Sequence, residues 1–427
     1  MIRQASALSA NLHDPAESVY SRWQRLNQWL SAHQILWRPT PYTDPRPAWT
    51  VQHRDLACDI EGLSDSACEA FDDSPEQLAE RLARFLPSLG ERQSLVALPA
   101  MADQQATVAA STLPETRATD MPGRKRLQAG AFAAAVSPLT ESVVDWCCGK
   151  GHLARTLAAQ CPTPITGWEW DDALVADGNR LARHFNDDVT LHRQDVMAPD
   201  LTLSEGAHGV ALHACGDLHR RLIRKVCEGG AARVSFSPCC YHLTATADYR
   251  PLAERVNGCK DTLALSRSEL RLAVRETVTA PARVRAERSR IRSWRLGFDG
   301  LQRALRGIDD YLSVPSHPAW LAGEDFEAFC RWAAEKKGLV LPAGIDFHYW
   351  QTFGEQRFSQ VRRHELVRHL FRRPLELWMV LDYALFLEEQ GYQVRLGTFC
   401  DRALTPRNIL VDAVRACGSP PVPHSRP

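Results

Sequence analysis

The 427-residue sequence lacks several features that mark specialised classes of protein. Its formal net charge is zero, so no overall field attracts nucleic acid or an anionic membrane surface. No apolar run approaches the roughly 20 residues that a membrane-spanning helix needs. Residues 1–11 also lack the apolar core of a secretory signal. We therefore expect a cytoplasmic protein without a membrane anchor.

Cysteine is plentiful, but it lacks the spacing of a disulfide framework or a zinc ribbon. The count of 13 is odd, and four of these cysteines form the adjacent pairs Cys147-Cys148 and Cys239-Cys240. No Cys-x-x-Cys pair is followed by a second pair or a histidine cluster. We expect reduced thiols, as in a cytosol, and we predict no structural zinc site of the usual spacing.

Lysine is absent from the first hundred residues, which hold nine arginines and thirteen acids. Apolar residues at helical spacing predict helices over 19–36 and 74–86, with Ser74 as the N-cap of the second. We assign residues 1–110 to an N-terminal accessory domain. Four tryptophans in this segment are expected to anchor its core rather than to form a ligand cage: Trp23, Trp29, Trp37 and Trp49.

From residue 120 onward, short apolar runs alternate with helical patterns, which is typical of a parallel sheet. We predict an α/β fold with a Rossmann-like, mostly parallel seven-stranded sheet and helices on both faces. Helices are expected over 151–160, 172–185 and 217–228. Strands are expected at Val143–Trp146, Ile165–Trp170, Val189–Gln194, Gly209–His213, Arg233–Ser237, Tyr392–Thr398 and Ile409–Val414.

The alternation stops after the fifth strand and resumes with a helix over 375–390. Residues 281–373 are mainly helical by composition, so we expect a helical insertion of about 90 to 130 residues. Residues 101–119 are weakly patterned and predict a linker. The expected divisions are an accessory domain (1–110), a core in two parts (111–243 and 374–417), the insertion (244–373) and a disordered tail (418–427).

Arginine is concentrated within the predicted insertion. Residues 281–306 hold eight arginines and two acids, and residues 357–373 hold six arginines, two histidines and one acid. Such a cluster is either a solvated helix face or a surface for phosphates, because the guanidinium group suits bidentate phosphate contact. RNA is therefore a candidate partner for these two segments. The sequence does not predict an oligomeric state.

The loop after the first predicted strand is the most informative segment. Two β-branched residues lead to Asp145, and a turn with Gly149 and Gly151 precedes a helix-forming run. Glycine permits positive φ and leaves room for a ligand against the backbone, and the helix N-terminus offers unpaired N–H groups. This strand, turn and helix predict a nucleotide-type cofactor site at 145–151.

Acids after the next two strands strengthen this prediction. Glu169 lies twenty residues after Gly149, where a carboxylate can accept hydrogen bonds from both ribose hydroxyls. Asp195 follows the third strand and could bind an adenine amino group. The structural alternatives are a surface carboxylate at a strand end for Glu169 and a helix N-cap for Asp195.

Two cofactor classes fit such a site. A dinucleotide carries an anionic pyrophosphate, beside which the carboxylate of Asp145 would be unfavourable. S-adenosylmethionine carries an ammonium and a sulfonium group, and Asp145 and Asp195 favour these positive charges. We therefore predict S-adenosylmethionine rather than a dinucleotide.

Titratable residues follow the fourth and fifth strands and should lie at the same sheet edge. His213 or His242 could remove a proton from a methyl acceptor, and Asp217 could orient one of them. A satisfied strand-end histidine and a helix N-cap are the alternatives for His213 and Asp217. The other candidates for catalysis are Cys239, Cys240 and Tyr241.

The cysteines at this edge have three possible roles. Packing is the favoured one, because paired cysteines behind strands usually act as small apolar residues. A nucleophilic role, as in enzymes that methylate pyrimidine carbons, is the second. The third is a metal cluster assembled from some of Cys147, Cys148, Cys215, Cys239 and Cys240.

Three motifs together resemble a known family. These are Asp145-Trp-Cys-Cys-Gly-Lys-Gly-His-Leu, Ala211-Leu-His-Ala-Cys-Gly-Asp-Leu and Pro238-Cys-Cys-Tyr-His. They are similar to class I S-adenosylmethionine-dependent methyltransferases, and more narrowly to the methyltransferase-like and glutathione S-transferase C-terminal-domain-containing group. Met121-Pro-Gly-Arg-Lys-Arg-Leu-Gln and Leu404-Thr-Pro-Arg-Asn agree with it, and acceptor-stem tRNA ribose methyltransferases are more distantly similar. The resemblance covers roughly 120–243 and 374–415.

The resemblance implies a methyltransferase that uses S-adenosylmethionine. Many class I enzymes have glycine at the place of Cys147, whose Cβ narrows the approach to the methionine end of the donor. The resemblance does not specify the acceptor. RNA (tRNA or rRNA) is favoured because the arginine-rich insertion could flank the site, and a protein or small-molecule methyltransferase and a non-catalytic cofactor-binding protein are the alternatives. The predicted cofactor-binding residues are Asp145, Cys147, Gly149, Lys150, Gly151, Glu169, Asp195 and His213.

Overall fold

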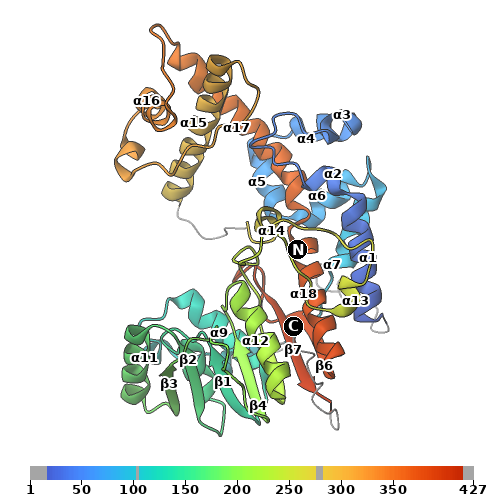
Figure 1. Ribbon diagram of the computed structural model, residues 1–427, viewed down its shortest axis with the longest axis vertical. Helices are drawn as coiled ribbons and strands as arrows, with labels where there is room; N and C mark the ends of the chain where they lie inside the picture. The colour runs from blue at the N-terminus through green and yellow to red at the C-terminus, as the bar shows by residue number, and fades with distance from the viewer. Residues whose placement is uncertain (1–16, 102–104, 276–281, 417–427) are drawn as a thin grey trace. The chain divides into compact units, whose positions relative to one another are not determined.

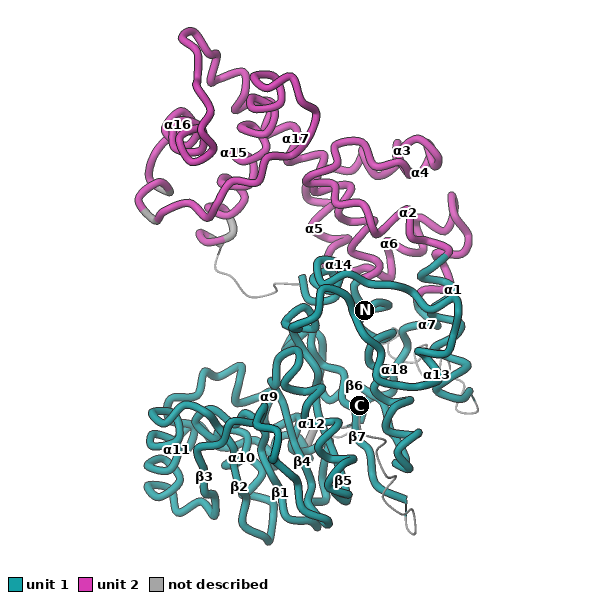
Figure 2. Tube along the Cα trace, viewed as in Figure 1, with its two compact units in different colours: residues 1–31, 93–278, 372–427 teal, residues 32–92, 279–371 magenta. Residues whose placement is uncertain are grey.

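The computed structural model describes residues 17–101, 105–275 and 282–416, which form two compact units. Unit 1 contains residues 1–31, 93–278 and 372–427, and unit 2 contains residues 32–92 and 279–371 (Figure 2). The predicted tail at 418–427 lies outside the described residues. Among the described helices, none combines the length and the apolar character that a bilayer crossing requires.

Unit 1 is built on a seven-stranded sheet in the order β3-β2-β1-β4-β5-β7-β6 (Figure 1). The first five strands are parallel, and β7 is antiparallel to both of its neighbours. The predicted fold class is therefore confirmed, including the closing pair of strands. The strands are β1 (Ser142–Trp146), β2 (Ile165–Glu169), β3 (Val189–Arg193), β4 (Ala207–Ala211), β5 (Arg233–Phe236), β6 (Tyr392–Thr398) and β7 (Ile409–Arg415).

Helices cover this sheet because the strands are apolar on both faces, as in other parallel sheets. β4, for example, is buried throughout its length. The chain runs outward from β1 to β3 and then returns to the other side of β1, so the strand order reverses between β1 and β4. The helices of the core are α9 (Gly123–Val136), α10 (His152–Ala158), α11 (Asp172–Phe185), α12 (Asp217–Gly229) and α18 (Arg372–Glu389).

A buried ion pair fixes the antiparallel strand in the sheet. Arg233 on β5 donates to Asp412 on β7 at 2.8 Å, and Ser235 donates to the same carboxylate at 2.7 Å. Both Arg233 and Asp412 are buried. Breaking one partner would leave an uncompensated charge in the sheet, which makes the register of β5 and β7 specific.

Segments from outside the predicted core complete unit 1. The first helix, α1 (Val19–Ala32), packs on α18, where the Trp378 indole donates to Asn27 at 3.0 Å. Asp382, fully buried on α18, accepts bonds from Tyr249 and from the Leu252 backbone. The remaining helices are α7 (Arg92–Val96), α8 (Gln105–Ser111), α13 (Glu254–Asn257) and α14 (Arg267–Ala273), with a 3₁₀ turn at Glu115–Arg117.

Unit 2 is helical, as predicted for most of the insertion. Its long helices α15 and α17 approach closely because glycines face each other: a Cβ on Gly354 would lie 2.4 Å from the Ser293 carbonyl oxygen. The aromatic core includes Trp294, Phe298 and Phe329. The helices are α2 (Gln34–Trp37), α3 (Trp49–Gln52), α4 (Arg54–Glu61), α5 (Asp65–Asp73), α6 (Pro75–Leu82), α15 (Ala282–Arg306), α16 (Phe326–Lys337) and α17 (Phe347–His369), with 3₁₀ turns at Pro87–Glu91 and Ala319–Gly323.

The units differ from the predicted divisions in a way that the contacts explain. Residues 32–92 and 279–371 share one unit because helices of the first segment pack on α17: Trp49 contacts His364 edge to face, and Arg368 donates to the Trp37 carbonyl at 2.8 Å. The four N-terminal tryptophans are core anchors, as predicted, with at most 5% of each exposed.

The predicted linker over 101–119 was wrong. It contains α8, which packs on α9 at a point where Gly130 has no side chain and Thr112 fills the space. A Cβ at Gly130 would lie 1.9 Å from the Thr112 hydroxyl oxygen. The alanine-rich composition that indicated a linker is also what allows this close contact between helices.

Candidate active site

The predicted site residues follow the carboxyl ends of β1 to β5 in unit 1. The reversal of strand order between β1 and β4 opens space for a ligand at this edge of a doubly wound sheet. The loops after β1 and β2 form one half of the site, which we call the donor half. The loops after β4 and β5 form the other, which we call the acceptor half.

The turn after β1 adopts the conformation that its glycines predicted. Gly149 and Gly151 have φ of 58° and 67°, and a Cβ built on Gly149 would meet no atom within 4 Å. Cys147 also has a positive φ of 58°. Glycine suits this position because it adopts the left-handed conformation without strain. Cysteine adopts the same conformation at a cost of about 1 kcal/mol. The turn leaves open space beside its backbone, which is what a bound cofactor requires.

Asp145 lies at the end of β1 under this turn. Its carboxylate accepts one hydrogen bond, from the Ala154 backbone in α10 at 3.1 Å, and 2% of the residue is exposed. Burial raises the pKa of Asp145 to about 7, although Ala154 and the positive charge of Lys125 act in the opposite direction. A buried carboxyl with so little compensation suits a cationic ligand, because a nearby positive charge favours its ionised form.

Glu169 ends β2 and is held rigidly beside the same turn. One carboxylate oxygen accepts from the Gly149 backbone at 2.9 Å, and the other accepts from Trp170 at 3.0 Å and Asp171 at 3.2 Å. The Glu169 carboxylate therefore joins the two loops of the donor half. The two carboxylate oxygens have about four lone-pair sites, and three accept backbone bonds, so capacity remains for a hydroxyl group on the oxygen that Gly149 contacts.

Asp195 follows β3 and is exposed. One of its oxygens accepts from the Met197 backbone at 2.8 Å, so it closes a turn rather than capping a helix. Two large apolar side chains lie beside these acids in the sequence and are unusually exposed. Trp170 follows Glu169 and is 71% exposed, and Met197 is 47% exposed. Their exposure could not be read from sequence, and it offers apolar surface for a planar base.

Three predicted donor-side residues have roles within the protein. Cys148 packs under the turn, where its sulfur would lie 2.8 Å from a Cβ on Gly167. Burial raises the pKa of Cys147 to about 12 and raises that of Cys148 further, so neither is a thiolate. Lys150 forms ion pairs with Asp177 at 3.0 Å and Asp120 at 3.4 Å, and its ammonium is already neutralised.

In the acceptor half, His213 follows β4 and contacts Gln128 on α9. The His213 Nε2 and the Gln128 side-chain oxygen are 3.4 Å apart, and the Gln128 amide donates to the Leu404 carbonyl at 2.9 Å. Because the amide group is used on Leu404, Gln128 offers its oxygen to the ring. His213 Nε2 then carries the proton, and the lone pair is on Nδ1. Loss of hydration and the charge of Lys125 lower the pKa of His213, which keeps it neutral at pH 7.

The loops after β4 and β5 continue to pair beyond the regular strands. The Gly216 backbone donates to the Cys239 carbonyl at 3.1 Å, and Asp217 donates to the Leu243 carbonyl at 3.0 Å. A Cβ on Gly216 would lie 1.9 Å from the Leu243 oxygen, so only glycine permits this approach. The pairing gathers the sulfur atoms of Cys215, Cys239 and Cys240 within 4.8 Å of one another. Hydrogen bonds from Cys215 and Cys239 lower the pKa of Cys240, and the charge of His242 acts in the same direction.

Two residues predicted to be catalytic are structural. Tyr241 is 3% exposed, its hydroxyl lies near Pro238 and Glu376, and burial raises its pKa well above the usual value. Asp217 accepts from the Ala245 backbone at 2.8 Å and lies 3.9 Å from Arg220, with no hydrogen bond to a histidine among the described residues. Gln128, and not Asp217, is the residue that contacts His213.

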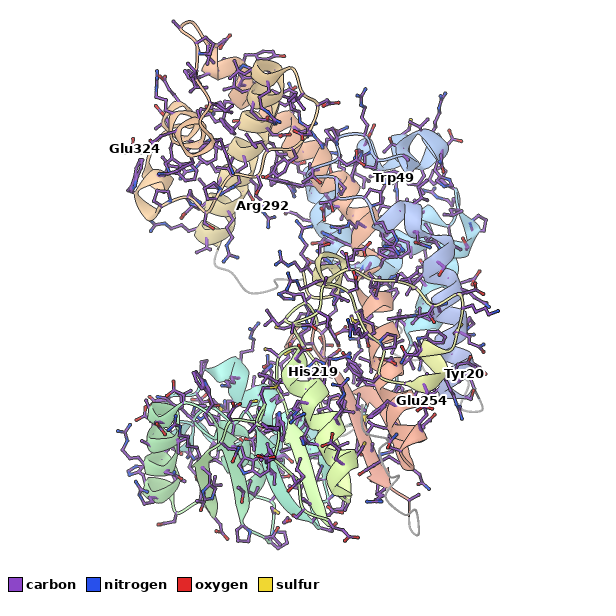
Figure 3. All side chains as sticks on the ribbon, viewed as in Figure 1. Tyr20, Trp49, His219, Glu254, Arg292 and Glu324 are labelled. Carbon is purple, nitrogen blue, oxygen red and sulfur yellow. The ribbon has the colours of Figure 1, made fainter. Side chains whose placement is uncertain are left out.

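A buried histidine, His219, holds the loop after β4 in the acceptor half. His219 lies on α12 (Figure 3), is 1% exposed and bonds the Ala214 carbonyl at 3.0 Å and the Tyr383 hydroxyl at 3.2 Å. It holds the loop between His213 and Cys215. Its own sequence context carries no signal that distinguishes it from a solvent-facing helical residue.

Positive charges border the acceptor half. Arg124 and Lys125 are exposed at the start of α9, and both lower the pKa of His213. Arg407, in the loop before β7, acts on the thiol of Cys240. No ion pair in the described part of the chain engages Arg124 or Lys125. The motifs Arg-Lys-Arg-Leu-Gln and Thr-Pro-Arg-Asn were the signals for these residues.

Residues 125–247 match the family model described as a methyltransferase domain. The match covers less than half of the chain, and it shows that this segment is similar to methyltransferase domains. The predicted enzyme class and its methyl donor, S-adenosylmethionine, are thereby confirmed for this part of the chain, and the match says nothing of the acceptor. No curated protein matches the chain by sequence.

Solved structures similar to this segment include methyltransferases of tRNA and of geranyl diphosphate. The tRNA (uracil-54, C5)-methyltransferase of Pyrococcus abyssi, in complex with S-adenosylhomocysteine, is 18% identical over 27% of this chain and 29% of its own, with a TM-score of 0.24. A geranyl diphosphate methyltransferase with sinefungin is 17% identical over 33% and 54%, with a TM-score of 0.25. The CcbJ methyltransferase of Streptomyces caelestis is 16% identical over 35% and 62%, with a TM-score of 0.23. This chain spans less than two thirds of each of these three.

Proposed function

We propose that this protein transfers a methyl group from S-adenosylmethionine to RNA, with His213 as the general base. We also propose that it belongs to the methyltransferase-like group with Gly-Lys-Gly and Pro-Cys-Cys-Tyr motifs. The arrangement of Glu169, Asp145 and the Gly149–Gly151 turn carries the donor side of the proposal. The basic residues beside His213 carry the acceptor side.

The donor half fits S-adenosylmethionine better than a dinucleotide. The Glu169 carboxylate suits the ribose hydroxyls, and the turn leaves room for the cofactor against its backbone. The apolar faces of Trp170 and Met197 suit the adenine ring. Asp145, buried and poorly compensated, suits the positively charged end of the donor and would repel a pyrophosphate.

S-adenosylmethionine supplies an electrophilic methyl group on a sulfonium. The protein must then hold the acceptor in line with that methyl group and take up the proton that the acceptor loses. His213 suits the second task because Gln128 holds the proton on Nε2 and leaves the Nδ1 lone pair available. An acceptor with a hydroxyl or ring N–H group matches this chemistry.

RNA is favoured because positive charge surrounds the acceptor half. Arg124, Lys125 and Arg407 can contact phosphates on either side of a target nucleotide. The arginine-rich segments of unit 2 contribute less free charge than their composition indicates. Arg357 and Arg368 are buried and donate to backbone carbonyls, and Arg303 pairs with Asp299 and Asp309. Exposed arginines there, such as Arg283 and Arg288, remain candidate phosphate contacts.

The experiment incubates the full chain and methyl-labelled S-adenosylmethionine with RNA, protein and small-molecule fractions of cells that lack this protein. We expect label in the RNA fraction, removed by ribonuclease. Label confined to protein or to small molecules would overturn RNA as the acceptor and would support the corresponding alternative.

A binding experiment tests the basic residues separately. RNA affinity should fall with rising salt, and the double change Arg124→Glu and Lys125→Glu should reduce both the affinity and its salt dependence. Lys260→Glu, at an exposed position in the segment before α14, is the matched control and should have little effect. Equal effects of the double change and the control would contradict the proposed phosphate contacts.

A further inference from the structure

Three cysteine sulfurs in the acceptor half lie close together without a function in the proposed reaction. Cys215 follows β4, and Cys239 and Cys240 follow β5. The sulfurs of Cys215 and Cys239 are 3.5 Å apart, and all three lie within 4.8 Å of one another. Among the described residues this is the one group of three or more potential metal ligands at such spacing.

The backbone brings these sulfurs together in two steps. First, Cys215 and Cys239 lie opposite each other in a parallel bridge, so their side chains leave the two loops on the same side. Second, Cys240 has a positive φ of 49°. In an extended strand the side chains of adjacent residues point to opposite faces. The left-handed residue interrupts this alternation and turns the third sulfur toward the other two.

The left-handed conformation of Cys240 costs free energy and is held by a specific backbone contact. A non-glycine residue in the left-handed region is disfavoured by about 1 kcal/mol, and such residues concentrate at functional sites. The Leu243 backbone donates to the Cys240 carbonyl at 2.8 Å, and Gly216 permits the approach of Leu243. Simple packing of small residues would not require either feature.

The spacing matches a metal-bound set of thiolates. Zinc binds cysteine sulfur at about 2.3 Å in a tetrahedral arrangement, so the sulfurs of one site lie about 3.8 Å apart. The separation of 3.5 Å between the sulfurs of Cys215 and Cys239 is close to this value and far from the roughly 2.05 Å of a disulfide. A site of this kind does not use the Cys-x-x-Cys spacing, so it corresponds to the metal cluster that the sequence left as a third possibility for these cysteines.

His242 follows the cluster in the sequence, and one of its ring nitrogens has no hydrogen-bond partner, although neither nitrogen lies within 4.8 Å of all three sulfurs. The Nδ1 atom of His242 is buried and makes no hydrogen bond within the described structure. A buried polar atom of this kind costs free energy unless something binds it. Cys₃His is one of the common ligand sets of structural zinc sites.

We propose that Cys215, Cys239 and Cys240 bind one zinc ion, which joins the loops after β4 and β5, and that His242 supplies the fourth ligand when its ring turns toward the ion. The ion replaces the thiol protons, since thiolates are the ligands. It lies next to the loop that carries His213 and so fixes the acceptor half independently of which molecule is methylated. This inference does not rest on the proposed RNA substrate or on the role of His213 as base.

The test measures metal in the full chain, produced with zinc and purified without chelator. We expect about one zinc per chain by inductively coupled plasma mass spectrometry. Replacement with cobalt should give the sulfur-to-metal charge-transfer absorption and the intense d–d bands of a tetrahedral thiolate site. Zinc that is released stoichiometrically when an organomercurial titrates the wild-type thiols would support the site without any variant.

Variants assign the ligands. Cys215→Ser, Cys239→Ser and Cys240→Ser should each lose most of the zinc, whereas Cys161→Ser should retain it. Cys161 is a matched control because it is half-buried in the same unit and, among the described residues, its sulfur makes one hydrogen bond, with the Thr163 hydroxyl. His242→Ala should shift the cobalt d–d bands and release zinc more readily to a competing chelator.

Three results would overturn the proposal. The first is wild-type protein that neither retains zinc nor develops cobalt charge-transfer bands. The second is a disulfide between Cys215 and Cys239 in unreduced protein, detected by peptide mapping. The third is zinc retention unchanged in all three serine variants. Unchanged cobalt bands in His242→Ala would overturn the assignment of the fourth ligand.

Discussion

The two halves of the site each contain an adjacent cysteine pair, and the structure uses the two pairs differently. Cys147 and Cys148 in the donor half lie within a turn where burial raises the pKa of both thiols. Cys239 and Cys240 in the acceptor half meet the sulfur of Cys215. One member of each pair has a positive φ. Both Cys-Cys pairs therefore lie at a bend of the backbone. They differ in the neighbouring loop, which brings a third cysteine sulfur to Cys239 and Cys240.

The same contrast extends to the other polar groups. The donor half consists of carboxylates held by backbone N–H groups, as in the three bonds to Glu169. The acceptor half consists of histidines, thiols and surrounding positive charge. A cationic donor and an anionic acceptor would each find complementary charge in its own half. Changes in the two halves should therefore affect different steps.

The largest effect is expected at the proposed base. His213→Ala should lower kcat by about 10²- to 10⁴-fold, the usual contribution of general-base catalysis, and leave the Kd for S-adenosylmethionine nearly unchanged. Single-turnover kinetics and calorimetric titration measure the two quantities. His192→Ala, at an exposed histidine on β3, is the control. A parallel loss of donor affinity in His213→Ala would mean that the two halves are not separable.

The next largest effect is expected at Glu169. Glu169→Ala removes the proposed ribose contact to a charged acceptor, so the Kd for S-adenosylmethionine should rise by about 10- to 100-fold. Asp172→Ala, which removes an exposed carboxylate three residues away, should change the Kd little. Calorimetric titration measures both. An unaltered Kd in Glu169→Ala would show that this carboxylate holds only the loop.

Much of this division was predictable because it follows strand ends. Hydrophobic alternation and the Gly149–Gly151 turn predicted the sheet, and the carboxyl ends of parallel strands meet at one edge. Glu169 could be predicted as a cofactor-binding residue from its distance along the sequence from the turn. The role of the Lys125–Gln128 segment was indicated by resemblance alone, because a helix residue that reaches a distant loop carries no periodic signal.

Other features depended on contacts that no local pattern specifies. Asp217 opens a helix, which is compatible with orienting a histidine, yet its carboxylate binds the Ala245 backbone. The convergence of Cys215 with Cys239 requires the register of β4 against β5. Residues 32–92 pack with 279–371 through tertiary contacts between distant segments. Sequence periodicity identifies faces that are buried and does not identify their partners.

A smaller and graded effect is expected from Asp145. Its carboxyl has a pKa of about 7 in the free protein, and a bound cation should lower that value. Binding then releases a proton below pH 7, so donor affinity should fall by about tenfold for each unit of pH below 7. Calorimetric titrations from pH 5.5 to 8.5 measure this dependence. Asp145→Asn should bind weakly and show a flat profile over this range.

The same group predicts an opposite effect on stability. Because the folded pKa lies above the value of 3.8 expected for an unfolded chain, the folded protein binds the extra proton between these values. Stability should therefore fall as pH rises from about 4 to 7 and stay level above. Asp145→Asn should raise the Tm of the free protein at pH 8 and not at pH 4. A lower Tm of Asp145→Asn at pH 8 would contradict the inference that the Asp145 carboxylate lacks compensating contacts.

The smallest effect separates the two cysteine pairs directly. In reduced, metal-free protein at pH 7, iodoacetamide should modify Cys240 at least several-fold faster than Cys147 or Cys148. The reason is that the thiolate reacts, and hydrogen bonds from Cys215 and Cys239 lower the pKa of Cys240 whereas burial raises the pKa of the donor-side thiols. Peptide mass spectrometry at timed intervals ranks the three. Zinc added beforehand should protect Cys240 and leave Cys147 and Cys148 unaffected, because among the described residues only the acceptor half gathers three potential metal ligands. Equal rates at all three positions would mean that the two pairs are chemically equivalent, and the division into a carboxylate half and a thiol half would lose its basis.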